Sequence, residues 1–183
     1  MARIPIMGAE DLAELLPWPK PDAHKYSRGK LTIVGGCASY PGAACLAALA
    51  SQRAGAGYTE VLCDPASVLT VRAFRPSLVV RSWEALDSES FAASRPGKPV
   101  AYAVGSGMDA SSDDGAAQAK RLVNLALKHA HAPVLVDGGG LAPLASDKGR
   151  RLLRRRFLNG WPTVITPHAG EAARLAAPFD LPT

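Results

Sequence analysis

Cysteine and aromatic residues are scarce in this sequence, and no long apolar run is present. The 183 residues include three cysteines, none of them in a CxxC spacing, so neither a disulfide framework nor a zinc site is expected. Aromatic residues make up 6% of the chain, which leaves no stacking platform for a nucleic acid. No apolar segment approaches about 20 residues, and no secretory signal is evident. We therefore expect a cytoplasmic protein that binds neither nucleic acid nor membrane.

The residues that are present have the composition of a globular protein. Apolar residues account for 48% and charged residues for 20% of the chain, which is far from the composition of disordered proteins. A chain of this length corresponds to about one domain. We expect residues 1–183 to form a single domain with a sizeable core.

The net charge of +5 comes largely from the stretch GRRLLRRRFLNG at 149–160. A surface for anions or nucleic acid is one interpretation. The other is a solvated amphipathic helix, in which Leu152, Leu153, Phe157 and Leu158 share an apolar stripe and the arginines lie mostly opposite. The second interpretation is favoured, because no groove-binding motif accompanies the arginines.

Short apolar runs alternate with helical patterns along the chain. The runs are apolar on both faces, as is typical of parallel strands covered by helices on both sides. We therefore predict an α/β fold with three α/β/α layers and a mostly parallel central sheet. The predicted strands are 31–34, 59–63, 77–81, 100–104, 133–136 and 163–165. The predicted helices are 9–16, 41–54, one beginning after Asp64 and Pro65, 113–131, 148–158 and 170–176, and 83–97 is predicted to be a polar surface connection.

Glycine and polar residues follow four of the predicted strands, in the loops 35–44, 105–109, 137–140 and 166–171. Because ligands of open α/β sheets bind beyond the carboxyl ends of the strands, these loops are expected to converge on one crevice. The first loop lacks the GxGxxG spacing of a dinucleotide fingerprint, and no P-loop pattern occurs.

The residue types in these loops favour a flat, anionic ligand that reacts at a hydroxyl group. Glycine allows close approach of the backbone, and helices that begin near Pro41 and Gly170 favour negative groups. His168 and Glu171 lie three residues apart across a helix start, and Asp137 could orient a hydroxyl or help to hold a metal. Each residue also has a purely structural interpretation, as a turn, a cap or a core histidine. Their coincidence at one edge of the sheet favours a site.

Four stretches of the sequence carry a family resemblance. They are HKYSRGKLTIVGGCASYPGAACLAALASQRAGAGYTEV, AVGSGM, VLVDGGGL and VITPHAGEAARL. In order and spacing they resemble the motifs of the ADP/ATP-dependent NAD(P)H-hydrate dehydratases, carbohydrate-kinase-related members of the ribokinase-like superfamily. The resemblance covers residues 24–176.

The resemblance implies repair of hydrated NADH and NADPH, in which phosphoryl transfer to the ring hydroxyl is followed by elimination. It implies ADP or ATP with Mg²⁺ as the co-reactant, with no tightly bound metal. The residues that it implies as substrate contacts are Ala44, Gly107 and His168, and those of the supporting wall are Tyr40, Gly42, Ala43, Asp137 and Glu171. Two alternatives remain, a ribokinase-like kinase of a small metabolite and a non-catalytic nucleotide-binding or assembly subunit.

The sequence departs from the family pattern at several points. Cys37 replaces a usual serine, Ser106 replaces a usual proline, and glycines at 138–140 loosen a turn. No GTGD motif, which carries the presumed catalytic aspartate of the family, occurs in residues 1–183. We therefore expect a fold without the last elements of the family, no activity of this chain alone, and either a homo-oligomer or a partner chain that supplies the missing segment.

Overall fold

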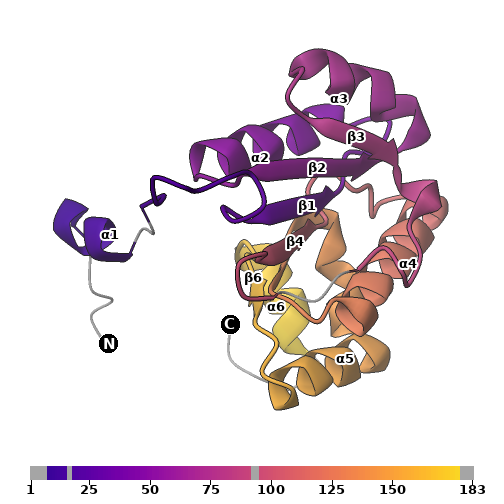
Figure 1. Cartoon of the computed structure of the whole chain (residues 1–183). Coiled ribbons are helices and arrows are strands. Elements are labelled where there is room, and N and C mark those ends of the chain that lie inside the picture. The colour runs from indigo at the N-terminus through magenta and orange to yellow at the C-terminus, as the bar shows by residue number, and fades with distance from the viewer. Residues whose placement is uncertain (1–7, 16–17, 92–94, 178–183) are drawn as a thin grey trace.

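A computed structural model describes residues 8–15, 18–91 and 95–177. Its centre is a six-stranded, all-parallel sheet in the order β3-β2-β1-β4-β5-β6 (Figure 1). The strands are β1 (Lys30–Val34), β2 (Tyr58–Cys63), β3 (Val79–Ser82), β4 (Val100–Val104), β5 (Val134–Val136) and β6 (Thr163–Ile165). The predicted α/β class is confirmed, and the pairing is parallel at every step.

Helices connect the strands and cover both faces of the sheet. They are α1 (Ala9–Leu15), α2 (Pro41–Arg53), α3 (Val68–Phe74), α4 (Asp113–His129), α5 (Asp147–Leu158) and α6 (Ala169–Ala176). Their starts follow local chemistry: Pro41 occupies the first turn of α2, where a missing N–H is harmless. The hydroxyls of Ser112 and Ser146 accept hydrogen bonds from backbone N–H groups in the first turns of α4 and α5.

Alternation along the strands divides the core into two layers. Ile33, Val61 and Val80 face the layer that includes residues of α2 and α3. Val34 and Leu62 face the opposite layer, which includes residues of α4. Both layers consist of fully or almost fully buried side chains, as expected for parallel strands that are covered on both sides.

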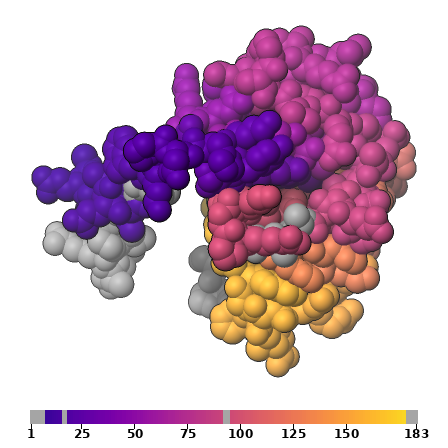
Figure 2. All heavy atoms as spheres, viewed as in Figure 1, coloured from indigo at the N-terminus to yellow at the C-terminus, as the bar shows by residue number. Residues whose placement is uncertain are grey.

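The N-terminal helix α1 stands clear of the remaining structure (Figures 1 and 2). None of its residues is buried. Leu12 and Leu15 are 46% and 67% exposed. The predicted helix at 9–16 is therefore present, although residue 16 lies outside the described part of the chain.

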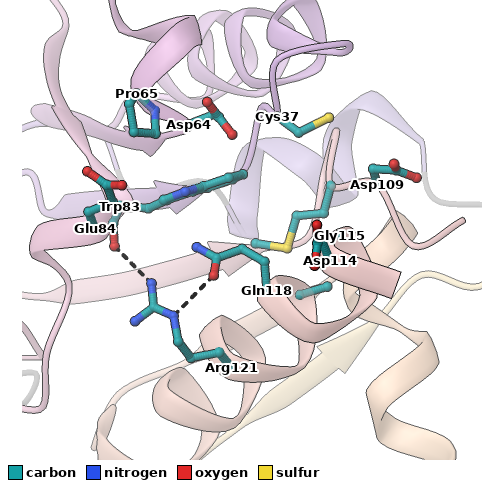
Figure 3. Close-up of a pocket in the computed structure, with 12 residues that line it drawn as sticks. Cys37, Asp64, Pro65, Trp83, Glu84, Asp109, Asp114, Gly115, Gln118 and Arg121 are labelled. Atoms are coloured by element: carbon teal, nitrogen blue, oxygen red, sulfur yellow. Dashed lines mark hydrogen bonds between the residues drawn. The ribbon is translucent and has the colours of Figure 1, made fainter. Parts of the chain in front are cut away.

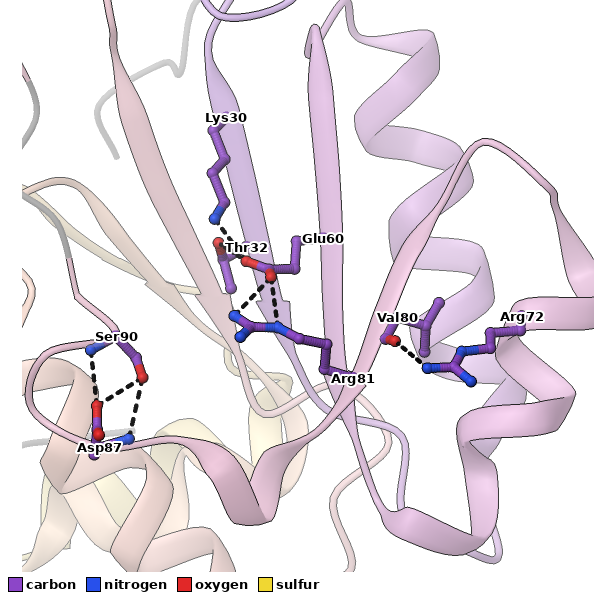
Figure 4. A network of polar contacts seen from close by, with 8 residues as sticks. All are labelled: Lys30, Thr32, Glu60, Arg72, Val80, Arg81, Asp87 and Ser90. Atoms are coloured by element: carbon purple, nitrogen blue, oxygen red, sulfur yellow. Dashed lines mark hydrogen bonds and ion pairs between the residues drawn. The ribbon is translucent and has the colours of Figure 1, made fainter.

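A buried carboxylate joins the strands of the α4-side face (Figure 4). Glu60 in β2 is 4% exposed. Its oxygens lie 2.6 Å from Lys30 Nζ and 2.7 Å from Arg81 Nη2, and Thr32 donates a hydrogen bond to it. Burial alone would raise the pKa of Glu60, but Lys30 and Arg81 outweigh burial and lower the pKa below its ordinary value.

The segment 83–97, described at 83–91 and 95–97, connects β3 to β4 and is mostly exposed, as predicted, but it is not polar throughout. Trp83, Leu86 and Phe91 within it are buried in the core beside α4. A short 3₁₀ turn, η2 (Trp83–Ala85), begins directly after β3. The prediction of a polar segment was wrong because these apolar residues are spaced too irregularly to give a helix or strand period.

The prediction for the basic stretch was wrong in two respects. Arg156 is fully buried, whereas Phe157 and Leu158 are 82% and 70% exposed. The Arg156 guanidinium donates to the carbonyls of Ala130, Ala132 and Pro162 and to the Thr163 hydroxyl. Burial lowers its pKa to about 10, which leaves the side chain charged at neutral pH. This arginine therefore ties the chain before β5 to the chain before β6.

The β6 end of the sheet is much less covered than its centre. Val164 and Ile165 are 54% and 40% exposed. Two shallow apolar cavities flank this strand, and both include Leu153 and Ile165 in their linings.

In the described part of the chain, every helix falls short of the length and apolar content needed to cross a membrane.

Candidate functional site

The loops that follow β1 and β4 are locked together at the carboxyl edge of the sheet. Gly36 donates a backbone hydrogen bond to Ser106 O at 3.0 Å, and Cys37 donates one to Gly107 O at 2.8 Å. A Cβ atom on Gly35 would lie 2.2 Å from Ser106 O. Gly35 is therefore required by contact with another loop of the same chain, before any ligand is considered.

Gly107 shows the same close packing against the start of α2. It has a φ of +71°, and an added Cβ would lie 2.6 Å from Tyr40 O and 2.8 Å from Ala43 Cβ. Gly105 is tighter still, with a φ of +119° and an added Cβ 1.9 Å from Asp137 O. Three of the predicted loops thus meet in one closely packed edge.

Asp137 links this edge to β6. Its Oδ2 accepts a hydrogen bond from Ser106 Oγ at 3.2 Å, and its Oδ1 accepts one from Thr166 Oγ1 at 2.7 Å. The sequence-based suggestion that Asp137 could orient a hydroxyl therefore has a structural counterpart, because it orients two hydroxyls of the protein itself. Serine at 106 supplies one of these donors, which proline at that position would not.

His168 and Glu171 form a reciprocal cap at the start of α6. The Glu171 carboxylate accepts from the His168 backbone N–H at 2.9 Å, and His168 Nδ1 accepts from the Gly170 N–H at 3.1 Å. The neutral imidazole consequently carries its proton on Nε2, which lies 3.5 Å from Glu171 Oε1. The His168 side chain is 70% exposed, so Nε2 is accessible to a ligand.

The residues at the start of α2 differ in what they offer to a ligand. Tyr40 is 58% exposed, and an added Cβ on Gly42 would meet no atom within 4 Å. Ala44 is fully buried, with its methyl 2.8 Å from the position of a Cβ on Gly36. Ala44 therefore supports the wall from behind in this structure, and its role as a substrate contact stays a prediction.

The described residues do not gather three histidine, cysteine, aspartate or glutamate side chains in a position to hold a metal ion. Both oxygens of Asp137 already accept hydrogen bonds from protein hydroxyls. Mg²⁺ that is bound with a nucleotide needs only one or two protein carboxylates beside water and phosphate oxygens, so what this donor set fails to provide is a resident metal site.

A cavity of about 690 Å³ opens beside the locked loops (Figure 3). It adjoins them through Cys37, which follows Gly36, and Met108, which follows Gly107. Its remaining lining consists of Asp64, Pro65, Trp83, Glu84, Asp109, Asp114, Gly115, Gln118, Ala119 and Arg121. Of these residues, Asp109 lies in a loop that the sequence interpretation assigned to the crevice. Asp64 and Trp83 were not assigned, although they directly follow β2 and β3 and could have been found by the same strand-end rule.

The all-parallel sheet and the loops at its carboxyl edge define an α/β protein of the kind that binds ligands at that edge. A ribokinase-like superfamily protein from Enterococcus faecalis V583 superposes with a TM-score of 0.69 and 20% identity, over 97% of this chain and 60% of that chain. A Bacillus subtilis ADP/ATP-dependent NAD(P)H-hydrate dehydratase, co-crystallised with ATP/Mg²⁺, gives a TM-score of 0.69 and 23% identity, over 97% of this chain and 57% of that chain. At these identities the likeness shows the shared fold.

Sequence comparison identifies the family. The family model described as NAD(P)H-hydrate dehydratase matches residues 31–181, and the chain belongs to this family. It is 36% identical over 172 residues to the ADP-dependent (S)-NAD(P)H-hydrate dehydratase of Xanthomonas campestris. The aligned region covers 87% of this chain and 52% of that relative. It is 33% identical over 179 residues to the bifunctional NAD(P)H-hydrate repair enzyme Nnr of Mycobacterium tuberculosis strain H37Rv, over 96% of this chain and 33% of the relative. The chain thus spans about half, or less, of the length of these relatives.

Proposed function

We propose that this chain binds hydrated NADH or NADPH and forms the substrate side of an ADP/ATP-dependent NAD(P)H-hydrate dehydratase. The observation that carries the proposal is the locked edge formed by Gly36, Gly105 and Gly107. It lies at the carboxyl end of the sheet, where ligands of open α/β folds bind. It is also built from the motifs that place the chain in the family.

The edge is suited to hold a phosphate-bearing, hydroxylated substrate close to the backbone. Open space at Gly42, in the first turn of α2, leaves room for a ligand group near backbone N–H donors. His168 presents an accessible Nε2–H that can donate a hydrogen bond to a ring substituent. Asp137 joins the two loops that carry Gly107 and His168, because its carboxylate accepts hydrogen bonds from the Ser106 hydroxyl of one loop and the Thr166 hydroxyl of the other.

ADP or ATP with Mg²⁺ would supply the phosphoryl group that turns the ring hydroxyl into a leaving group. The described residues do not match a resident Mg²⁺ site, so no step is assigned to a metal held by this chain. A metal ion would have to arrive with the phosphates of the nucleotide, as in other phosphoryl transfers. The absence of a resident metal was a prediction from the sequence and stays one.

We further propose that a second copy or a partner chain supplies the phosphoryl-transfer groups. The exposed apolar surface around β6 supports this proposal, because large bare patches are unusual on monomers. The three free cysteines support a reducing, cytoplasmic setting.

An assay of repair tests the proposal. The chain is incubated with hydrated NADH, Mg²⁺ and ADP or ATP, and recovery of the reduced-nicotinamide absorbance is followed together with hydrate binding by calorimetry. We expect binding of the hydrate with little or no recovery by the chain alone. Absence of hydrate binding would contradict the proposed function, and rapid recovery would contradict the need for further groups.

A further inference from the structure

We propose that the cavity beside the locked edge binds the adenosine end of the hydrated dinucleotide, and that it disfavours the form that carries a 2′-phosphate. This inference rests on the proposed function and assigns part of the substrate to a cavity whose lining, apart from Cys37 and Met108, lies outside the family motifs. For brevity, the cavity lined by Cys37, Asp64, Trp83, Glu84, Asp109, Asp114 and Arg121 is called the acidic cavity.

The charge of the acidic cavity excludes phosphate groups. Four carboxylates line it, against one guanidinium. Arg121 directs its donors to the backbone carbonyls of Trp83 and Leu86 and to Gln118, so it offers little to a ligand. Hydrogen bonds from Ser111 and Ser112 lower the pKa of Asp109, which keeps that carboxylate charged. The resulting negative potential repels anions and attracts hydrogen-bond donors.

The indole of Trp83 supplies a further, independent feature. Figure 3 shows it between Asp64 and Pro65 on one side and Gln118 and Arg121 on the other. The residue is 4% exposed and lines the cavity. Within the described part of the chain its N–H has no acceptor, yet it is not among the fully enclosed polar atoms. The N–H is therefore open to solvent, and it can donate to an acceptor that a ligand brings.

An adenosine group matches these features. Its amino group and ribose hydroxyls are donors for carboxylates, its ring nitrogens are acceptors for the indole N–H, and its flat base fits beside Pro65 and Met108. The cavity volume of about 690 Å³ is within the usual range for small-molecule sites. A metal ion does not match, because no three carboxylates of the described residues converge on one point.

The position of the cavity assigns it to the non-reacting end of the substrate. The reacting ring must meet the phosphate of a nucleotide, and four carboxylates would repel that phosphate. His168 follows β6, three inter-strand steps or about 14 Å from β1, on the side away from the acidic cavity. The locked edge lies between His168 and the acidic cavity, and α2 begins there at Pro41. We therefore assign the pyrophosphate of the dinucleotide to this edge.

Binding of three probes to the full chain tests the inference. A Trp18→Phe, Trp161→Phe variant leaves Trp83 as its only tryptophan, so its fluorescence reports on the acidic cavity. We expect adenosine and adenosine 5′-monophosphate to change the Trp83 emission. Adenosine 2′,5′-bisphosphate should bind about tenfold more weakly than the monophosphate at low salt, a difference of about 1.4 kcal/mol.

Charge variants give the matched comparison. Glu84 and Asp114 are exposed, so Glu84→Gln with Asp114→Asn should preserve the fold and bring the two nucleotide affinities within about threefold, as expected if the carboxylates cause the discrimination. Asp147→Asn, which removes an exposed carboxylate on α5, should leave the tenfold difference unchanged. Equal binding of the two nucleotides to the unaltered chain would overturn the inference, as would an absence of any response to adenosine.

Competition separates this inference from the proposed function. If hydrated NADH binds and adenosine does not compete with it, the cavity assignment fails and the proposed function stands. If adenosine binds but hydrated NADH binds no more tightly than adenosine, the proposed function fails and the cavity remains an adenosine site.

Discussion

The centre of the parallel sheet and its β6 edge are covered to different degrees. At the central strand β1, Ile33 and Val34 are 1% and 0% exposed, and the loop beyond them is held by backbone contacts. At the β6 end, Val164 and Ile165 are 54% and 40% exposed. The comparison indicates that the carboxyl edge at the centre of the sheet is closed by packing within this chain, whereas the β6 side presents apolar surface that another polypeptide could cover.

The largest effect is expected from Gly105→Ala, in the loop that directly follows the central strand β4. The added Cβ would lie 1.9 Å from Asp137 O, in a backbone conformation with φ of +119°. Strain and overpacking together should cost more than about 3 kcal/mol of unfolding free energy, measured by urea denaturation. Gly97→Ala is the control, since that glycine also has a positive φ but meets no atom within 4 Å. Equal losses in the two variants would show that close packing is not what the edge depends on.

Arg156→Met should have the next largest effect and acts at the β6 end. It removes the guanidinium donor of the Ala130 and Ala132 carbonyls, whereas the Pro162 carbonyl keeps its hydrogen bond from the Val134 N–H. Each buried unsatisfied group costs about 1–3 kcal/mol, so the unfolding free energy should fall by about 3 kcal/mol. Arg154→Met, at an exposed position of the same helix, should change it by less than about 0.5 kcal/mol. A loss of unfolding free energy in Arg156→Met that is as small as that in Arg154→Met would mean that other contacts hold β6 in place.

Glu60→Gln should destabilise the chain by about 2 kcal/mol at neutral pH, because Lys30 and Arg81 lose their buried partner. The pKa of Glu60 is lowered in the folded state. Its contribution is therefore fully present above the unfolded-state pKa of about 4.3 and is lost as the pH falls through the folded-state pKa. Thermal denaturation from pH 7 to pH 3 should show that the difference in Tm between the variant and the parent becomes smaller below about pH 4. A gap that widens on acidification would contradict this assignment.

Ile165→Ser should change folding little and association more. The side chain is already 40% exposed, so the unfolding free energy of a monomer should fall by no more than about 1 kcal/mol. If the β6 face is covered by another copy, sedimentation at high concentration should show weaker self-association of the variant. Leu46→Ser is the control. It removes an exposed leucine of α2 and should leave the self-association of the chain unchanged. A parent chain that is monomeric at every concentration would exclude self-association and leave a partner chain as the proposed cover.

Much of the fold follows from short-range patterns in the sequence. Runs such as LTIV and AYAV are apolar on both faces, and that pattern is specific to covered parallel strands. The positions of Trp83 and Arg156 could not be predicted in the same way. Trp83 is buried by α4, which lies far from it in sequence, and Arg156 is buried because its donors satisfy carbonyls from two distant loops. Both depend on tertiary contacts that no local period reports.

The candidate site was predicted in outline for a related reason. Glycines and polar residues after four strands predicted that these loops meet at one edge of the sheet, and the structure brings Gly36, Gly107 and Asp137 together there. The reason for each glycine could not be read from the sequence. Gly107 is required by the packing of the protein itself, whereas the space beside Gly42 is open.

Gly42→Ala tests the central claim most directly, because it adds a methyl group to the proposed wall without touching the protein. The account predicts an unfolding free energy that is unchanged or raised by up to about 1 kcal/mol, together with binding of hydrated NADH at least about tenfold weaker by calorimetry. Unchanged binding of the hydrate to a folded Gly42→Ala variant would contradict the claim that this edge faces the substrate.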